Sequence, residues 1–273
     1  MQRIARSNFS LCGFTAAAML FLAPLAQAQA PEQGEVPEIK AVVGFPFSAV
    51  GIQENVRETT DGNRFIHKIT THHYRDGQGR TRLERELPMR VSASNATETT
   101  YVTVTINNRV TGEIDMLFPY GKLASVTQRP GMKVVDVPAA MPEIITRFAG
   151  MRFGPKDPGW SAPVSLGEKS IEGLHAVGTQ RTFTVAAGLV GNQQAVTITV
   201  QQWSSPDLGV ILDRTSRTST GGEVHYQLQQ IVQAEPSADL FTVPAGYRKI
   251  TVNRATGDLT DTQGTSTAVA QKQ

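Results

Sequence analysis

The chain has 273 residues, with 26 Lys and Arg against 24 Asp and Glu, and it contains a single Cys. A chain so close to neutral has no strong attraction to a phosphate backbone, so nucleic acid is not an expected partner. One cysteine cannot form an internal disulfide, so burial of apolar surface has to stabilise the fold.

The first 28 residues have the three-part layout of a secretory signal peptide. Two arginines make a basic start, residues 11–25 form a short apolar run, and small residues follow it. We expect cleavage between Ala28 and Gln29. A retained membrane anchor is the alternative, but a spanning helix needs about 20 apolar residues, and Pro24 interrupts this run earlier.

Cleavage at this place changes what the composition implies. The mature chain keeps 24 basic and 24 acidic residues, because Arg3 and Arg6 are lost, and it has no cysteine. Cys12 lies inside the apolar run rather than directly after the cleavage site, so no lipoprotein signal is expected. The sequence therefore predicts a periplasmic or secreted protein, soluble after signal-peptide cleavage and without a transmembrane segment.

The rest of the chain is expected to form a flexible leader, one β domain and a tail. Residues 29–46 are rich in Pro, Glu and Gly, which favours a flexible leader, and residues 251–273 are too polar to bury much surface, which favours a disordered tail. Residues 47–250 are expected to form a single β domain, because apolar and polar residues alternate with a period of two. The apolar sets are Val50, Ile52 and Val56; Val102, Val104 and Ile106; Val196, Ile198 and Val200; and Val224, Tyr226 and Leu228. This alternation is typical of antiparallel strands with one buried face.

Turn residues separate these runs and predict the topology. Gly accommodates a positive φ and Asp or Asn bonds to the nearby backbone, so both favour tight hairpins. Such residues occur at 61–63, 76–79, 111–112, 191–192 and 221–222. Links this short place strands adjacent in the sequence side by side, so we expect a mainly β, antiparallel meander.

Residues from about 130 to 163 interrupt this pattern. Four apolar residues after Pro142 have helical spacing, and they are Ile144, Ile145, Phe148 and Met151. They predict a short helix, while prolines on both sides indicate an irregular excursion. We expect a short helical or irregular cover over one face of the sheet, and a boundary between two domains is the alternative.

No motif for catalysis, a metal ion or a cofactor is present. The five histidines form no HxH on one strand, no HExxH and no Cys/His cluster. The sequence also contains no GxSxG and no Gly-rich phosphate loop. We therefore expect no enzyme activity, no cofactor and no metal. A hydrolase assembled from scattered acids or serines is an alternative.

Two other features are candidates for a contact with a partner or ligand. Arg75, Arg80 and Arg82 surround one hairpin end and are candidate partner contacts; the alternative is a solvated loop whose arginines pair with nearby glutamates. Trp203 breaks the alternation of its strand just before a turn, so it either closes the core or stands at the mouth of a ligand groove.

Several motifs resemble those of a large group of secreted bacterial proteins of unassigned function. The resemblance spans roughly residues 45 to 247, and its most specific part is Leu240-Phe241-Thr242-Val243-Pro244-Ala245-Gly246-Tyr247. Other matching segments are Asp61-Gly62-Asn63-Arg64, Tyr74-Arg75-Asp76 and Gln202-Trp203-Ser204-Ser205-Pro206-Asp207-Leu208. That group is in turn similar to the periplasmic lipoprotein-carrier (LolA/LolB-like) superfamily, which includes envelope-stress sensors.

This resemblance implies an incomplete barrel or strongly curved sheet around an apolar hollow, partly closed by helices. It also implies a non-enzymatic envelope protein that holds an acyl chain or another hydrophobic ligand. The candidate ligand-binding residues are Val196, Ile198, Val200, Trp203, Leu212, Tyr226 and Leu228, and plain core residues are the alternative for each. The alternative function is a protein-interaction or envelope-sensing module, whose partner would be an envelope protein.

Overall fold

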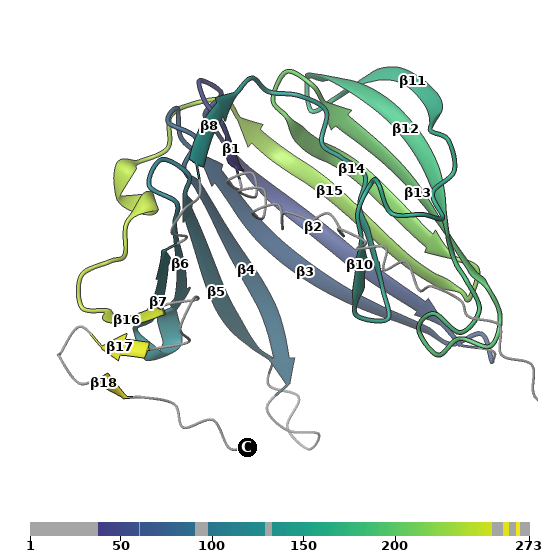
Figure 1. The fold of residues 1–273 in the computed structure, drawn as a ribbon, viewed down its shortest axis with the longest axis horizontal. Coiled ribbons are helices and arrows are strands. Elements are labelled where there is room, and N and C mark those ends of the chain that lie inside the picture. Colours follow the sequence, from purple (N-terminus) through teal and green to yellow (C-terminus); the bar gives the residue numbers. More distant parts are fainter. Residues whose placement is uncertain are drawn as a thin grey trace, which may run out of the picture. The chain divides into compact units, whose positions relative to one another are not determined.

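Two antiparallel meanders lie side by side in one large sheet (Figure 1). The first contains β2 (Phe47–Glu58), β3 (Arg64–Arg75), β4 (Thr81–Arg90), β5 (Glu98–Asn108), β6 (Glu113–Phe118) and β7 (Leu123–Gln128). The second contains β11 (Val164–Ile171), β12 (Leu174–Val185), β13 (Val196–Ser205), β14 (Val210–Thr218) and β15 (Gly222–Val232). Within each meander every strand pairs with the next one along the chain, as the short turns predict.

The structure is a computed structural model that describes residues 38–59, 61–90, 98–128, 133–252, 259–261 and 266–267. All of these residues belong to the unit Val36–Gln273. The predicted signal peptide and its cleavage site between Ala28 and Gln29 lie outside them. Within the described ranges, no helix has the length and apolar character needed to cross a bilayer.

The two meanders meet where β15 pairs antiparallel with β2, so strands from distant parts of the sequence are neighbours. Arg57, for example, pairs with Gly222. At one edge, β16 (Arg248–Val252) pairs in parallel with β7, and β17 (Leu259–Asp261) and β18 (Ser266–Thr267) follow it. The described sheet is curved and runs from β11 to β18 without closing into a barrel. The predicted mainly β, curved antiparallel fold is confirmed.

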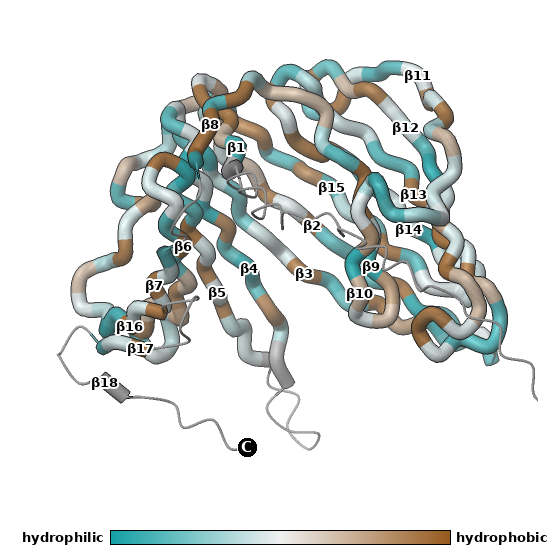
Figure 2. The backbone as a smooth tube through the Cα atoms, in the orientation of Figure 1, coloured by the Kyte–Doolittle hydropathy of each residue, from teal (hydrophilic) through white to brown (hydrophobic). Residues whose placement is uncertain are grey.

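The predicted alternation is correct for β13 and for Val104 and Ile106 of β5, but Val224 of β15 is exposed and the predicted face of β2 is wrong. The hydropathy changes over short stretches along the strands (Figure 2), and the alternate apolar residues of β13 are buried as predicted. In β2, however, Phe47 and Ala49 are buried, whereas Ile52 and Val56 are only half-buried. The reason is that Phe47 and Ala49 pack against Leu228 and other apolar residues of the second meander.

The helix predicted from Ile144, Ile145, Phe148 and Met151 does not form. Residues 138–145 are irregular, and β9 (Thr146–Phe148) and β10 (Met151–Phe153) then make a short hairpin. Ala149 and Gly150 connect its strands with φ of 48° and 80°, as a two-residue hairpin turn requires. The helical spacing was misleading because Ile144 and Phe153 anchor an extended segment to the sheet. The cover is therefore irregular.

Parts of the predicted leader and tail form strands. β1 (Glu38–Val42), inside the leader predicted over residues 29–46, pairs in parallel with β8 (Lys133–Val137). β16 to β18 carry the sheet into the tail predicted over residues 251–273. Pairing with a neighbouring strand satisfies the backbone N–H and C=O groups of such polar segments, and local composition does not reveal that contribution.

Three apolar clusters pack against the two faces of the sheet. The first joins the hairpin β9–β10 to β12 and β13 and contains Ile144, Phe153, Phe183, Val185, Val196, Ile198 and Val200. The second contains Phe47, Ala49, Ala176, Leu208, Leu212 and Leu228. The third places Phe241 of the 3₁₀ helix η2 (Ala238–Phe241) against Val104, Ile106, Leu117 and Ala124. The hairpin and η2 lie on opposite sides of the sheet (Figure 1).

Candidate functional site

Residues 142–147, which we call the strap, cross the concave face of the sheet ahead of the hairpin turn. Two side chains from the second meander hold its backbone. Gln202 Nε2 donates to the carbonyl of Pro142 at 2.9 Å, and Arg214 donates to the carbonyl of Ile145. Burial lowers the pKa of Arg214, but an arginine starts from so high a value that it stays charged. Side-chain donors from β13 and β14 therefore attach the strap to the sheet.

Three adjoining cavities, which we call the trough, lie between the strap and the sheet. Their volumes are about 470, 470 and 310 Å³. The first and second share Asn55, Arg147, Ser216 and Val224, and the second and third share Ile211 and Tyr226. The three cavities are therefore neighbours along the concave face, and each has the size of a small-molecule site, about 300–1,000 Å³.

Strand register brings the floor of the trough together. Asn55 of β2 lies opposite Val224 of β15 on one side and opposite His67 of β3 on the other. Because paired residues point to the same face, side chains from three strands meet there. Along β15 the floor extends from Leu228 to Gly222, a span of about 20 Å at 3.4 Å per residue. An extended acyl chain has a comparable length.

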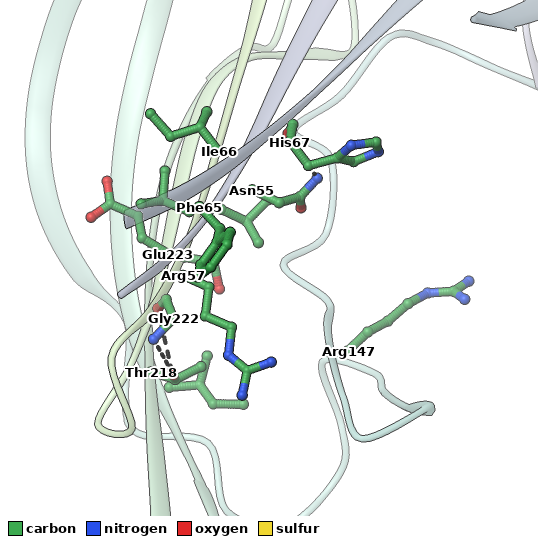
Figure 3. Close-up of a pocket in the computed structure, with 13 residues that line it drawn as sticks. Asn55, Arg57, Phe65, Ile66, His67, Arg147, Thr218, Gly222 and Glu223 are labelled. Atoms are coloured by element: carbon green, nitrogen blue, oxygen red, sulfur yellow. Dashed lines mark hydrogen bonds between the residues drawn. The ribbon is translucent and has the colours of Figure 1, made fainter. Parts of the chain in front are cut away.

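The two ends of the trough differ in polarity. The third cavity forms the apolar end, lined by Phe47, Pro142, Val210, Ile211 and Leu228, with His73 and Tyr226 beside them. The first cavity forms the basic end, where Arg57, His67 and Arg147 stand near Phe65, while Ile66 and Glu223 border it but extend to the other side of their strands (Figure 3). Phe65 is 57% exposed, so apolar surface is accessible at the basic end too.

A buried polar cluster lies next to the apolar end. His73 Nε2 is 2.8 Å from Thr71 Oγ1 and 3.3 Å from Tyr226 Oη, and the Thr71 hydroxyl donates to the carbonyl of Gly51. Burial, with smaller contributions from His72 and Arg85, lowers the pKa of His73 to about 4. Its ring is therefore neutral at pH 7. A Cβ on Gly51 would come within 2.8 Å of His73 Nε2, so this close packing requires glycine.

Three of the seven predicted ligand-binding residues line the trough, namely Ile198, Tyr226 and Leu228. The other apolar ones are buried in the first and second clusters and line none of the three cavities: Val196, Val200 and Leu212. A direct role of these buried residues in binding stays a prediction.

Trp203 points to the face opposite the buried alternate residues of β13, so its break in alternation is real. It packs at the edge of the second cluster, and Lys169 Nζ lies 3.9 Å from the ring centroid. Gly178 leaves room for the ring, because a Cβ there would come within 2.7 Å of it. Trp203 lines none of the three cavities, so its packing matches the core alternative.

The three arginines predicted to contact a partner bond within the fold. Arg75 is buried and donates to the carbonyls of Phe45 and Leu208, which rules it out as an exposed contact. Burial lowers its pKa to about 10. Arg80 and Arg82 each pair with a nearby carboxylate, at 2.5 and 2.7 Å. A partner contact by these two arginines stays a prediction.

The described residues contain no group of three or more His, Cys, Asp or Glu side chains that could hold a metal ion. Three histidines, His72, His175 and His225, each lie beside a single carboxylate at 3.0 to 3.3 Å. Such isolated pairs supply too few ligands for a protein metal site.

Sequence reasoning missed the strap and the polar floor of the trough. The alternation in β2 assigns Gln53, Asn55 and Arg57 to the solvent side, and the structure places them along the trough. The alternate polar residues of β2 correctly indicate one shared face of the strand. They do not indicate that a segment far along the chain, around Ile145, crosses that same face.

Comparisons with known proteins give structural likenesses only. No protein-family model matches the sequence, and a search of curated proteins finds no match. LprF from Mycobacterium bovis is similar at 13% identity, over 75% of this chain and 90% of that one, with a TM-score of 0.31. A β-barrel-like protein with a domain of unknown function from Brucella abortus is similar at 9% identity, over 71% and 100%, with a TM-score of 0.31.

A LolA superfamily protein from Nitrosomonas europaea is also similar, at 8% identity, over 74% of this chain and 92% of that one, with a TM-score of 0.28. All three TM-scores are well below 0.5.

Proposed function

We propose that this protein is an exported, non-enzymatic binding protein of the cell envelope that holds the hydrophobic part of a ligand in the trough. The observation that carries the proposal is the row of three neighbouring cavities along the concave face, which share lining residues. The predicted signal peptide supports the location. The trough is the ligand-sized space next to the largest sheet of the described chain, and concave apolar sites are where small ligands bind.

The chemistry of the apolar end supports a hydrophobic ligand. Phe47, Ile211 and Leu228 line it, and burying a ligand chain against such side chains is favourable by about 25 cal/mol per Å² of apolar surface. The polar groups beside them already bond to one another, since His73 lies within hydrogen-bond distance of Thr71 and Tyr226. An apolar chain therefore leaves few polar groups there without partners.

Filling the trough with a larger side chain should weaken binding. Ser216 lines both larger cavities, so Ser216→Phe places an aromatic ring in the space that the ligand needs. We expect the affinity for a fluorescent fatty acid to fall about tenfold or more. Fluorescence titration measures this directly, and native mass spectrometry of protein purified from the envelope shows whether a lipid co-purifies with the wild type and not with the variant.

Thr215→Phe is the matched control, because the next residue on a strand points to the opposite face. It adds the same ring to β14 outside the trough and should leave binding unchanged, while thermal melts show that both variants fold. Unaltered binding by Ser216→Phe would contradict the proposed site. A wild type with no co-purifying lipid and no uptake of the fatty acid would contradict the proposed function.

A further inference from the structure

The trough carries an excess of positive charge. Three arginines line it, Arg57, Arg147 and Arg214, and among the described lining residues Glu223 is the one carboxylate. Glu223 accepts two hydrogen bonds from Arg217, at 3.0 and 3.2 Å, so its charge is already balanced. A concave surface of one sign focuses its field on the space inside and attracts the opposite charge.

Two of these arginines are available to a ligand. Arg214 donates to the backbone of the strap, whereas Arg57 and Arg147 have no ion-pair partner in the described part of the chain. Both are exposed. Arg57 extends from the sheet toward the strap, and Arg147 stands on the strap with its guanidinium turned outward at the rim (Figure 3). Both line the first cavity, and exposed side chains change rotamer within nanoseconds, so either guanidinium can turn toward a head group bound there.

We propose that the trough binds a long-chain fatty acid, with its carboxylate held by Arg57 and Arg147 and its chain extending toward Phe47 and Leu228. This inference rests on the proposed function and adds the class and direction of the ligand. A planar guanidinium matches a planar carboxylate through two parallel hydrogen bonds. The apolar end lies about 20 Å along β15 from the basic end, which suits a single extended chain.

The experiment compares two probes with the same tail and a different head. cis-Parinaric acid has a carboxylate, and its methyl ester has none, so their affinities differ only by the charged contact. We expect the wild type to bind the acid about tenfold more tightly than the ester, and this preference should shrink at high salt. Arg57→Gln with Arg147→Gln should remove the preference by lowering the affinity for the acid about tenfold, to that for the ester.

Arg64→Gln is the matched control. Arg64 precedes Phe65 on β3 and so points to the opposite face of the sheet; it is exposed and lines none of the three cavities. This substitution removes one positive charge, as each of the two test substitutions does, and the variant should still bind the acid more tightly than the ester. Because all three arginines are exposed, none of these variants is expected to affect folding.

Each outcome separates this inference from the proposed function. Equal binding of acid and ester by the wild type overturns the carboxylate assignment and leaves hydrophobic binding standing. No binding of either probe overturns both. Stronger displacement of the probe by 1-palmitoyl lysophosphatidate than by palmitate would show that a phosphate head is preferred and would overturn the fatty-acid assignment.

Discussion

Replacing Phe183 with Ala should lower the free energy of unfolding by about 3–5 kcal/mol. Phe183 on β12 is 1% exposed. Its ring centroid lies 4.4 Å from that of Phe153 and 5.0 Å from that of Trp160. The smaller side chain leaves a cavity between the sheet and the cover, so packing is lost on both sides. Urea unfolding followed by circular dichroism measures the change.

The same substitution tests whether the cover is held by this packing. In Phe183→Ala, hydrogen exchange should accelerate more for residues 146–153 than for the strands of the large sheet, because the hairpin loses its main apolar contact. Thr184→Ala, at the exposed neighbouring position, should change stability by less than about 0.5 kcal/mol. A loss below about 1 kcal/mol for Phe183→Ala would contradict the described packing of Phe153 and Trp160.

Asp115→Asn should stabilise the protein by about 2–3 kcal/mol at pH 7.5 and by almost nothing at pH 3.5. Asp115 on β6 is 4% exposed, and its Oδ1 has no hydrogen-bond partner among the described residues. Burial, with a smaller contribution from Glu113, raises the pKa of Asp115 to about 6, and Lys249 opposes the shift. Asn keeps the shape of the side chain without the buried charge.

The sign of this pH dependence follows from the raised pKa. The folded protein holds the proton of Asp115 more tightly than the unfolded chain does, so this group stabilises the fold below pH 3.8. That stability is lost as the pH rises through about 6, where the buried carboxylate ionises. Urea midpoints at several pH values measure it. Asp136→Asn, at an exposed position, is the control, and equal midpoints for Asp115→Asn and wild type at pH 7.5 would contradict the prediction.

The local part of the fold could be predicted from the sequence because it depends on neighbours. Turn residues such as Gly62 and Gly112 adopt positive φ and mark where hairpins reverse. Alternation marks which residues of β13 are buried. These signals act over a few residues, and the sequence displays them directly.

The long-range part could not be predicted, since it depends on which distant segments meet. The polar residues of β2 predict a solvent-exposed face, whereas in the structure the strap near Ile145 crosses that face. The strap itself has helical spacing, and tertiary contacts from Gln202 and Arg214 override that local preference. The trough therefore forms only when the strap packs over the sheet, and no sequence motif predicts it.

The join between β2 and β15 also has a consequence for how the chain folds. Leu228 pairs with Gly51, so the middle of the sheet cannot form until nearly all of the chain is available. Contacts between such distant residues make folding slow. If the chain is exported as we propose, slow folding would help to keep the polypeptide unfolded during translocation. A chain truncated before β15 should leave the edge of β2 unpaired and prone to aggregate.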